Sequence, residues 1–186
     1  MDVSARVFVQ PYQGKSYSIL RGAGIGLAAT YGREQGTSSD EQLPSFQTAG
    51  RSTFFEYTED GDDAVADGGH YRVSPQATWF EGPFGLLTEY VRSSQQVARD
   101  PERGWVDNDA WQIRASWMLT GEDASMKGIE PNSPFDFGGG QWGAWELALR
   151  WSSLDVDGEA FRKEFADPAE SARTADALAT AVNWYL

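Results

Sequence analysis

The sequence contains no cysteine and no long apolar run, and both absences narrow what the chain can be. Without cysteine, disulfide bonds and thiol chemistry are excluded, and the usual thiolate ligands of zinc are missing. No segment reaches the roughly 18 apolar residues that a transmembrane helix needs. This absence does not exclude a membrane protein, because a barrel strand spans the lipid with about ten residues of alternating polarity.

Basic residues are also scarce. The chain has 15 Lys and Arg against 28 Asp and Glu, which gives a net charge of −13. This balance disfavours nucleic acid as a partner, because phosphate contacts need clustered lysines and arginines. The N-terminal residues lack the basic start and apolar core of a signal peptide. Since an outer-membrane protein must be exported, a membrane interpretation requires that the chain is a fragment or that Met1 is not the natural start.

Aromatic residues and glycine are abundant instead, at 13% and 20 residues, and this mixture favours strands and turns. The clearest pattern is period-two alternation, which runs through Ala110–Leu119 and Gly143–Ser153. With the weaker segments it predicts one all-β, antiparallel domain over residues 1–186 with about nine strands, one of them Leu43–Thr48. The pattern places five large side chains on one face: Trp111, Trp117, Trp145, Leu147 and Trp184.

The predicted connectors alternate between short and long. Glu81–Gly85 is tight, whereas Glu59–Gly69, Ala98–Asp109 and Asp155–Arg173 are long and acidic. Strand parity predicts that these three loops lie at one end of the sheet and the tight turn at the other. This is typical of outer-membrane barrels, which have short periplasmic turns and long extracellular loops. Thr120–Gln141 is the exception, because it is long yet falls on the short-turn side.

Two architectures fit this pattern. One is an up-and-down transmembrane barrel, whose apolar faces meet lipid. The other is a soluble β-sandwich that binds carbohydrate through exposed aromatic side chains. The tryptophans favour the barrel, because they sit towards strand ends, and amphipathic rings prefer the membrane interface.

Several segments resemble the phosphate-selective porin O/P family. They include LTGEDAS at 119–125, PFDF at 134–137, GAWELA at 143–148, RWSSLDVD at 150–157 and FADP at 165–168. Further upstream, ADGGHYRVSPQ at 66–76 and GPFGLLTEY at 82–90 resemble it as well. The resemblance implies a transmembrane barrel in the bacterial outer membrane, with lipid and lipopolysaccharide around it. It also implies a water-filled channel for small solutes, with anions such as phosphate as candidates, and a homotrimer.

The resemblance places this chain in the second half of such a barrel, so about nine strands form an incomplete barrel. Its candidate ion-path residues are the four arginines expected on the inner face: Arg6, Arg72, Arg114 and Arg150. Arginine suits phosphate, because its planar fork donates two parallel hydrogen bonds and stays charged. The alternative is that these arginines only pair with inward carboxylates such as Glu56, Glu89 and Glu146.

Other sites are weaker. The acidic run Glu59–Asp63 could bind Ca²⁺, but a solvated loop explains it better, because the final glutamate ligand of an EF-hand is missing. His70 is the only histidine, so it predicts no metal site and is expected at a strand start. Gly138–Gly140 lacks the lysine of a phosphate loop, and no serine has a nucleophile-elbow sequence. The sequence therefore predicts a channel without catalytic activity or cofactor, with a general, non-selective porin as the main alternative.

Overall fold

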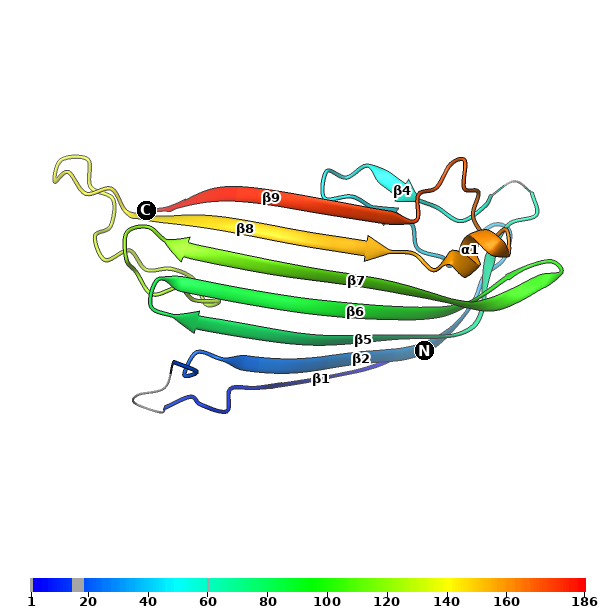
Figure 1. The fold of residues 1–186 in the computed structure, drawn as a ribbon, viewed down its shortest axis with the longest axis horizontal. Helices are drawn as coiled ribbons and strands as arrows, with labels where there is room; N and C mark the ends of the chain where they lie inside the picture. Colours follow the sequence, from blue (N-terminus) through cyan, green and yellow to red (C-terminus); the bar gives the residue numbers. More distant parts are fainter. Residues whose placement is uncertain (1, 15–18, 60) are drawn as a thin grey trace.

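The computed structural model describes residues 2–14, 19–59 and 61–186, and its main feature is one antiparallel sheet of seven strands (Figure 1). The strands follow one another in the order β1-β2-β5-β6-β7-β8-β9. They are β1 Val3–Val9, β2 Gly24–Gln35, β5 Val65–Glu81, β6 Phe84–Arg99, β7 Glu102–Met118, β8 Ala144–Asp155 and β9 Thr174–Tyr185. This order confirms the predicted antiparallel up-and-down fold as a partial barrel, since β1 and β9 do not pair within the described residues.

The cross-strand register sorts the side chains onto two faces. On the outer face, Trp117 of β7 lies opposite both Phe84 of β6 and Leu147 of β8. On the same face, Trp145 of β8 lies opposite Trp184 of β9. Because directly opposed residues share a face, the register confirms that the large side chains predicted to lie together do so. The inner face carries mostly small and polar residues.

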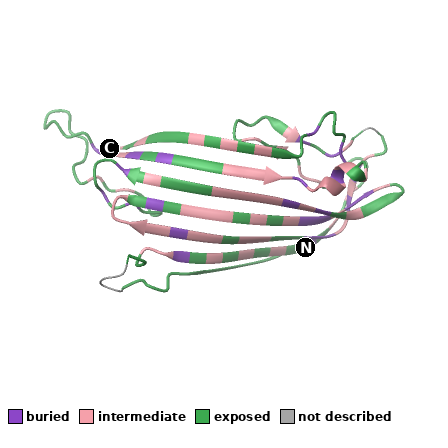
Figure 2. Ribbon diagram, in the orientation of Figure 1, coloured by how far each residue is buried: buried purple, intermediate pink, exposed green. Residues whose placement is uncertain are grey.

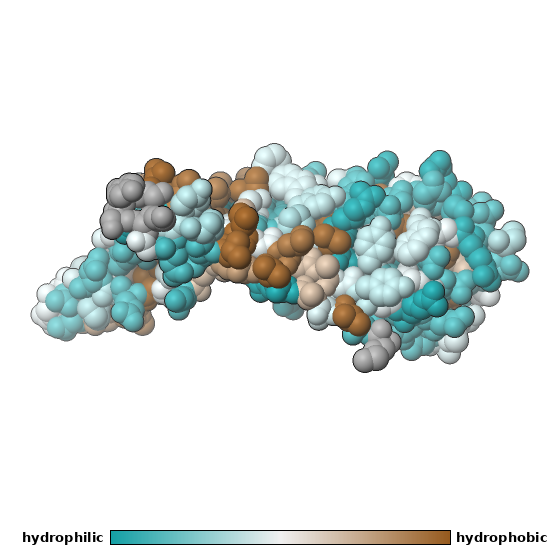
Figure 3. All heavy atoms as spheres, turned by 90° about the horizontal axis from the view of Figure 1, so that it is seen from below, coloured by the Kyte–Doolittle hydropathy of each residue, from teal (hydrophilic) through white to brown (hydrophobic). Residues whose placement is uncertain are grey.

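The outer face forms an apolar band that none of the described segments covers. Its large side chains remain well exposed, including Val7, Leu27, Leu86, Ile113, Leu149, Trp151, Leu178 and Val182. In Figure 3, hydrophobic side chains gather over the central part of the molecule, and hydrophilic ones occupy both ends. The sandwich alternative is therefore wrong, because the only other sheet in the described residues is the small β3-β4 pair, which packs on the inner face.

Aromatic residues border this band at both ends of the strands. At one end, Phe84 stacks on Trp117 with ring centroids 6.2 Å apart, and Trp145 stacks on Trp184 at 5.4 Å. Trp79 of β5 lies at the same end as these pairs, and Tyr71 of β5 lies towards the other end. The two residues are eight positions apart, which corresponds to about 26 Å along a strand. A band of about 25 Å between two aromatic girdles matches the lipid-facing surface of an outer-membrane barrel.

The connectors divide between the two ends of the sheet as parity predicted. The β5–β6 turn is made by Gly82 and Pro83, and Gly82 has a φ of +52°, which glycine adopts without strain. The longer connections 36–64 and 156–173 lie at the opposite end, with the β6–β7 turn (Figure 1). Following barrels of the outer membrane, we call this the extracellular end and the other the periplasmic end.

Two predicted loop boundaries were wrong. Ala98–Asp109 is not a loop, because β6 and β7 run through it and turn only at Asp100 and Pro101. Asp67–Gly69 likewise belongs to β5. The acidic side chains there have partners across strands instead of lying in solvent: Asp67 pairs with Arg103 at 2.9 Å. Strand hydrogen bonding and these ion pairs outweigh the usual preference of acidic residues for loops.

Two of the nine predicted strands are not barrel strands. β3 (Phe46–Gln47) and β4 (Thr53–Phe55) are only 2 and 3 residues long, and they pair with each other as a separate hairpin. They belong to the connection between β2 and β5. Their phenylalanines are apolar enough to suggest strands, but they pack into a core at the extracellular end instead of facing lipid.

That core joins the hairpin to the inner face of the sheet. It contains Phe55, Tyr57, Ala64, Val97, Val106, Val156, Ala160, Phe165 and Ala166. Val97 and Val106 come from the inner face of β6 and β7, whereas Ala160 lies on the helix α1, Gly158–Arg162. Asp157 caps α1 by accepting a hydrogen bond from the Glu159 N–H. No helix among the described residues is long and apolar enough to cross a membrane.

The periplasmic end has a smaller core. Met118, Ala124 and Ala144 are buried there, with Phe80, Ile129 and Tyr185 packed around them. Buried residues concentrate at the ends of the strands and in the loops near α1, while the middle of the strands is mostly intermediate or exposed (Figure 2). The segment that did not fit the loop pattern, 120–141, therefore folds back against the periplasmic strand ends, with the Ala124 N–H bonded to the Gly82 carbonyl at 2.7 Å.

Candidate functional site

The inner face of the sheet is the candidate site, and all four predicted arginines lie on it. Arg6 stands opposite Ala28, and Arg72 stands opposite Thr30. Arg114 of β7 lies directly opposite Arg150 of β8. The register therefore brings only two of the four side by side, near the middle of their strands.

The two arginines nearer β1 have neutral partners. Arg6 donates from Nη2 to Oε1 of Gln76 at 3.2 Å, and Arg72 donates from Nε to Oγ of Ser93 at 3.4 Å. Neither side chain has a carboxylate partner within the described residues. Each guanidinium therefore keeps its full positive charge facing the inner side.

Among the described residues, Arg114 is the one arginine of the four that pairs with a carboxylate. Its Nη2 lies 3.5 Å from Oε1 of Glu146, which is buried, whereas about half of the Arg114 side chain is exposed. Glu146 also accepts hydrogen bonds from Asn183 and from the Tyr185 hydroxyl, each at 2.7 Å. Glu146 thus shares its negative charge among three donors, of which Arg114 is the only cation within the described residues.

Arg150 differs from Arg114, because its side chain has neither an ion pair nor a hydrogen bond within the part of the chain that the structure describes. It is exposed on β8, and its neighbour across β9 is Ala179. A shallow hollow of about 210 Å³ opens beside the two arginines. Its floor is formed by small side chains, Ala148, Ala179 and Ala181, which leave room for a solute next to both guanidinium groups.

The other predicted inward carboxylates do not pair with these arginines. Glu89 accepts hydrogen bonds from Ser74 at 2.8 Å and from Gln112 at 3.0 Å. Glu56 lies outside the barrel strands, beyond the end of β4. Of the three carboxylates considered as arginine partners, only Glu146 acts as one.

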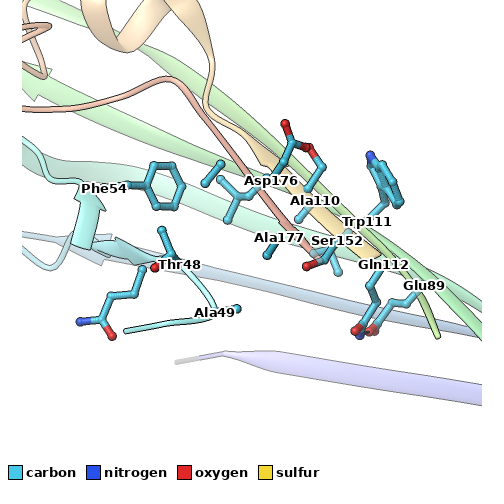
Figure 4. Close-up of a pocket in the computed structure, with 15 residues that line it drawn as sticks. Thr48, Ala49, Phe54, Glu89, Ala110, Trp111, Gln112, Ser152, Asp176 and Ala177 are labelled. Carbon is cyan, nitrogen blue, oxygen red and sulfur yellow. Dashed lines mark hydrogen bonds between the residues drawn. The ribbon is translucent and has the colours of Figure 1, made fainter. Parts of the chain in front are cut away.

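The β3-β4 hairpin narrows the space above this face. Figure 4 shows Thr48 and Ala49 of the hairpin facing Ser152 and Ala177 of the sheet. A cavity of about 220 Å³ lies between them. Ser152 is two positions from Arg150, about 7 Å along the strand, so the hairpin lies next to the arginine pair on its extracellular side.

The hairpin is fixed by a buried aromatic cluster. The Phe55 ring lies 5.0 Å from that of Tyr57 and 5.9 Å from that of Phe161. Burial raises the pKa of the Tyr57 hydroxyl from 10 to about 12, helped by the negative charge of Asp157, although a hydrogen bond with Asn108 opposes the rise. Tyr57 therefore stays neutral over the physiological range.

Comparison with known families now identifies the chain. The family model described as phosphate-selective porin O and P matches residues 11–186. The chain belongs to this family. A search of curated proteins found no matching relative. The porin family is one of non-enzymatic channel proteins of the bacterial outer membrane, which agrees with the apolar outer face and the polar inner face described above.

Two features of this porin escaped the sequence analysis. The hairpin was counted among the barrel strands, and only its contacts, far apart in sequence, show that it lies on the inner face. The alanine row of β9 did carry a signal, since Ala175, Ala177, Ala179 and Ala181 recur at every second position. Small side chains that recur in this way on an inner face leave space for a solute.

The predicted place of His70 was wrong. It lies within β5 and not at a strand start. Asp2 and Glu34 lie close to it, so three residues with possible metal ligands meet there. In the acidic run, Asp60 lies outside the described residues, and Arg99 donates from Nε to the Asp62 carbonyl at 2.7 Å.

A charged group at the periplasmic end is structural. Glu122 is buried, and burial alone would raise its pKa. Hydrogen bonds from the Thr120 hydroxyl, from its own backbone N–H and from the Asn132 N–H outweigh burial and hold the pKa below its ordinary range. The carboxylate therefore stays charged and fixes the segment 120–132 against the strand ends.

Proposed function

We propose that this porin conducts small solutes with a preference for anions, phosphate among them, and that the Arg114–Arg150 pair sets this preference along the part of the wall that the chain forms. The observation that carries the proposal is Arg150: an exposed, mid-strand cation opposite a second arginine and beside a hollow floored by alanines. Two opposed cations with one neighbouring carboxylate, that of Glu146, leave a net positive charge at this level of the inner face.

The net charge of −13 does not oppose this proposal. Many of the acidic residues lie in connectors at the two ends of the sheet, such as the run from 59 to 63. Salt screens charges over about 8–10 Å, so remote loop carboxylates contribute little at mid-strand. A unit charge 7 Å from an ion is worth about 0.6 kcal/mol even in bulk water, or about threefold in local ion concentration. Nearby wall charges therefore dominate.

Phosphate fits the pair better than chloride does. Each guanidinium can donate two parallel hydrogen bonds to oxygens of a phosphate, and directly opposed residues of neighbouring strands are about 5 Å apart. The hairpin supports the proposal as well, because it narrows the passage just above the arginines and so brings a passing ion close to them.

The test is the reversal potential, in a planar bilayer under a KCl gradient, of the closed barrel in which this chain forms part of the wall. Arg150→Glu should lower the permeability ratio of anion to cation several-fold, and Arg114→Glu together with Arg150→Glu should lower it further. Arg33→Glu is the matched control, since it makes the same charge change on the outward side of β2 and should leave the ratio unchanged. An unaltered reversal potential in the double variant would show that these arginines do not select ions.

A general porin without selectivity is the second candidate. Glu89 and Glu146 favour it, because both carboxylates lie on the inner face and offset part of the arginine charge. The two candidates separate in the same recording: a general porin gives a ratio near one in the unsubstituted protein, and added phosphate does not reduce its chloride current.

The same proposal includes assembly as a homotrimer in a membrane whose outer leaflet carries lipopolysaccharide. The outer face supports the lipopolysaccharide part of this proposal, because charged groups replace the apolar band towards the extracellular end. There Arg92 pairs with Asp107 at 2.7 Å and lies 3.7 Å from Asp109. Such a rim is suited to a layer of charged headgroups above the acyl chains.

A further inference from the structure

Three potential metal ligands meet at the extracellular end of the inner face, away from the arginine pair. Asp2, directly before β1, is followed across the sheet by Gly32 of β2, His70 of β5 and Gln95 of β6. Glu34 is two positions beyond Gly32 on the same face. One ligand atom from each of Asp2, Glu34 and His70 can be chosen so that all three lie within 4.8 Å of one another.

The His70 imidazole is buried without a hydrogen bond. The residue is 4% exposed, and its Nδ1 atom has no hydrogen-bond partner within the described residues. Nδ1 lies 3.4 Å from Oε2 of Glu34, and Nε2 lies 3.5 Å from Oδ2 of Asp2. Both distances are longer than a normal hydrogen bond, and a buried polar atom without a partner destabilises a fold. The imidazole is therefore held where another group could satisfy it.

A glycine keeps the space between these ligands open. A Cβ atom at Gly32 would lie 2.1 Å from Oδ1 of Asp2 and 2.8 Å from Cε1 of His70. Any side chain at this position would displace both residues. The sheet thus brings a carboxylate and an imidazole over a bare stretch of backbone, from two strands that flank β2.

We infer that Asp2, Glu34 and His70 bind a divalent transition-metal ion of the zinc type. Zn²⁺ takes imidazole nitrogen and carboxylate oxygen at about 2.0–2.2 Å, so two ligands of a tetrahedral site are about 3.4 Å apart. One imidazole nitrogen and one oxygen of each carboxylate lie within 4.8 Å of one another, and the distance of 3.4 Å from Nδ1 of His70 to Oε2 of Glu34 is of this size. Two carboxylates also balance the charge of the ion, and water completes its coordination.

A further residue positions one of the ligands. Gln95 donates from Nε2 to Oε2 of Glu34 at 3.0 Å and to the Gln42 carbonyl at 3.2 Å. Ligating carboxylates are usually held by such outer hydrogen bonds. The Asp2 side chain is more than half exposed, which leaves the ion a path from solvent. Because the three ligands come from the start of β1, from β2 and from β5, the ion would tie these strands together at their extracellular ends.

The experiment uses the full chain refolded in detergent micelles, with ZnCl₂ alone as the probe in calorimetry. His70 is the only histidine and cysteine is absent, so the imidazole resonances in NMR report on this residue without overlap. We expect one Zn²⁺ per chain and a shift of the His70 resonances that saturates at the same ratio. Asp2→Asn and Glu34→Gln should each weaken binding at least ~10-fold, as even outer-sphere changes do.

The control variants distinguish Zn²⁺ binding at this site from unfolding and from binding by other surface carboxylates. Asp123→Asn with Glu130→Gln removes two exposed carboxylates at the periplasmic end and should leave Zn²⁺ affinity unchanged. Asp2→Asn is conservative and exposed, so loss of binding in this variant does not come from unfolding, which circular dichroism checks. Absence of saturable Zn²⁺ binding overturns the inference. So does binding that survives His70→Gln, since surface carboxylates would then explain it.

Discussion

The two faces of the sheet alternate along the same strands, yet they follow different physical rules. The outer face needs only apolar side chains at every second position, and any of several residues meets that need because lipid makes no specific contact. On the inner face, polar side chains differ in whether they have a specific partner. Glu146 has three donors within 3.5 Å, whereas Arg150 has none of the described residues as partner. Under the proposal above, function on this sheet depends on which inner positions are left without partners.

The inner face itself has two parts that differ in how far water reaches them. At the extracellular ends of β6, β7 and β8 it is dry, because the hairpin and α1 pack on it around Phe55 and Phe165, both fully buried. In the middle it is wet, because alanines and arginines leave it open. The same face thus acts as a core at one level and as a channel wall at the next.

The largest expected effect comes from opening the dry part. Phe55→Ala should destabilise the packing of the hairpin by about 3–5 kcal/mol, the usual cost of removing a buried phenylalanine ring. Released from the sheet, the hairpin should be cleaved faster by trypsin at Arg51, and single-channel conductance should rise. Phe137→Ala is the control, since Phe137 is 85% exposed in the periplasmic segment. Equal trypsin sensitivity of the two variants would show that Phe55 does not hold the hairpin.

A smaller effect should separate the outer from the inner face. Leu149→Arg places a charge in the apolar band and should cost about 2–4 kcal/mol of unfolding free energy near the membrane midplane. Ala181→Arg places the same side chain on the inner face, where water solvates it, and should stay within about 0.5 kcal/mol. Urea unfolding in lipid vesicles measures both. If the two substitutions cost the same, the assignment of the faces is wrong.

The alternation of side chains along each strand explains why the sequence predicts which face a residue lies on better than it predicts which residues are in contact. Alternation depends on each strand alone, so Trp111, Trp145 and Arg114 could be placed on their faces without a structure. The predicted strand boundaries at the extracellular end were wrong, because acidic residues there pair with residues of other strands, as Asp67 does with Arg103. Composition alone assigns such residues to loops.

Contacts between distant segments could not be predicted in the same way. The hairpin contacts residues from β6 to β9, and only the folded chain shows that its phenylalanines turn inward. His70 meets Asp2 and Glu34 through the register of three strands, and a shift of one residue would move each of them to the outer face. Register depends on turns and packing together, which local patterns do not contain.

The smallest predicted effect is a pH dependence of stability that comes from Tyr57. It tests whether the part of the inner face under the hairpin is dry. Burial raises the pKa of Tyr57 from 10 to about 12 in the folded protein, whereas the unfolded chain ionises near 10. Between these values the unfolded state releases the proton first, so the folded state loses stability as pH rises, by roughly 1 kcal/mol for each pH unit. Below pH 10 the group contributes no such change.

Tyr57→Phe should remove this loss and flatten the stability curve between pH 10 and 11, relative to the unsubstituted protein. The measurement is the thermal unfolding midpoint in detergent, followed by near-ultraviolet circular dichroism at intervals from pH 9 to 11. Tyr12→Phe, at a tyrosine that is 42% exposed, controls for removal of a hydroxyl. If the Tyr57→Phe curve falls as steeply as that of the unsubstituted protein, water reaches Tyr57. The hairpin core would then be as wet as the arginine level of the wall, and the contrast between the two parts would fail.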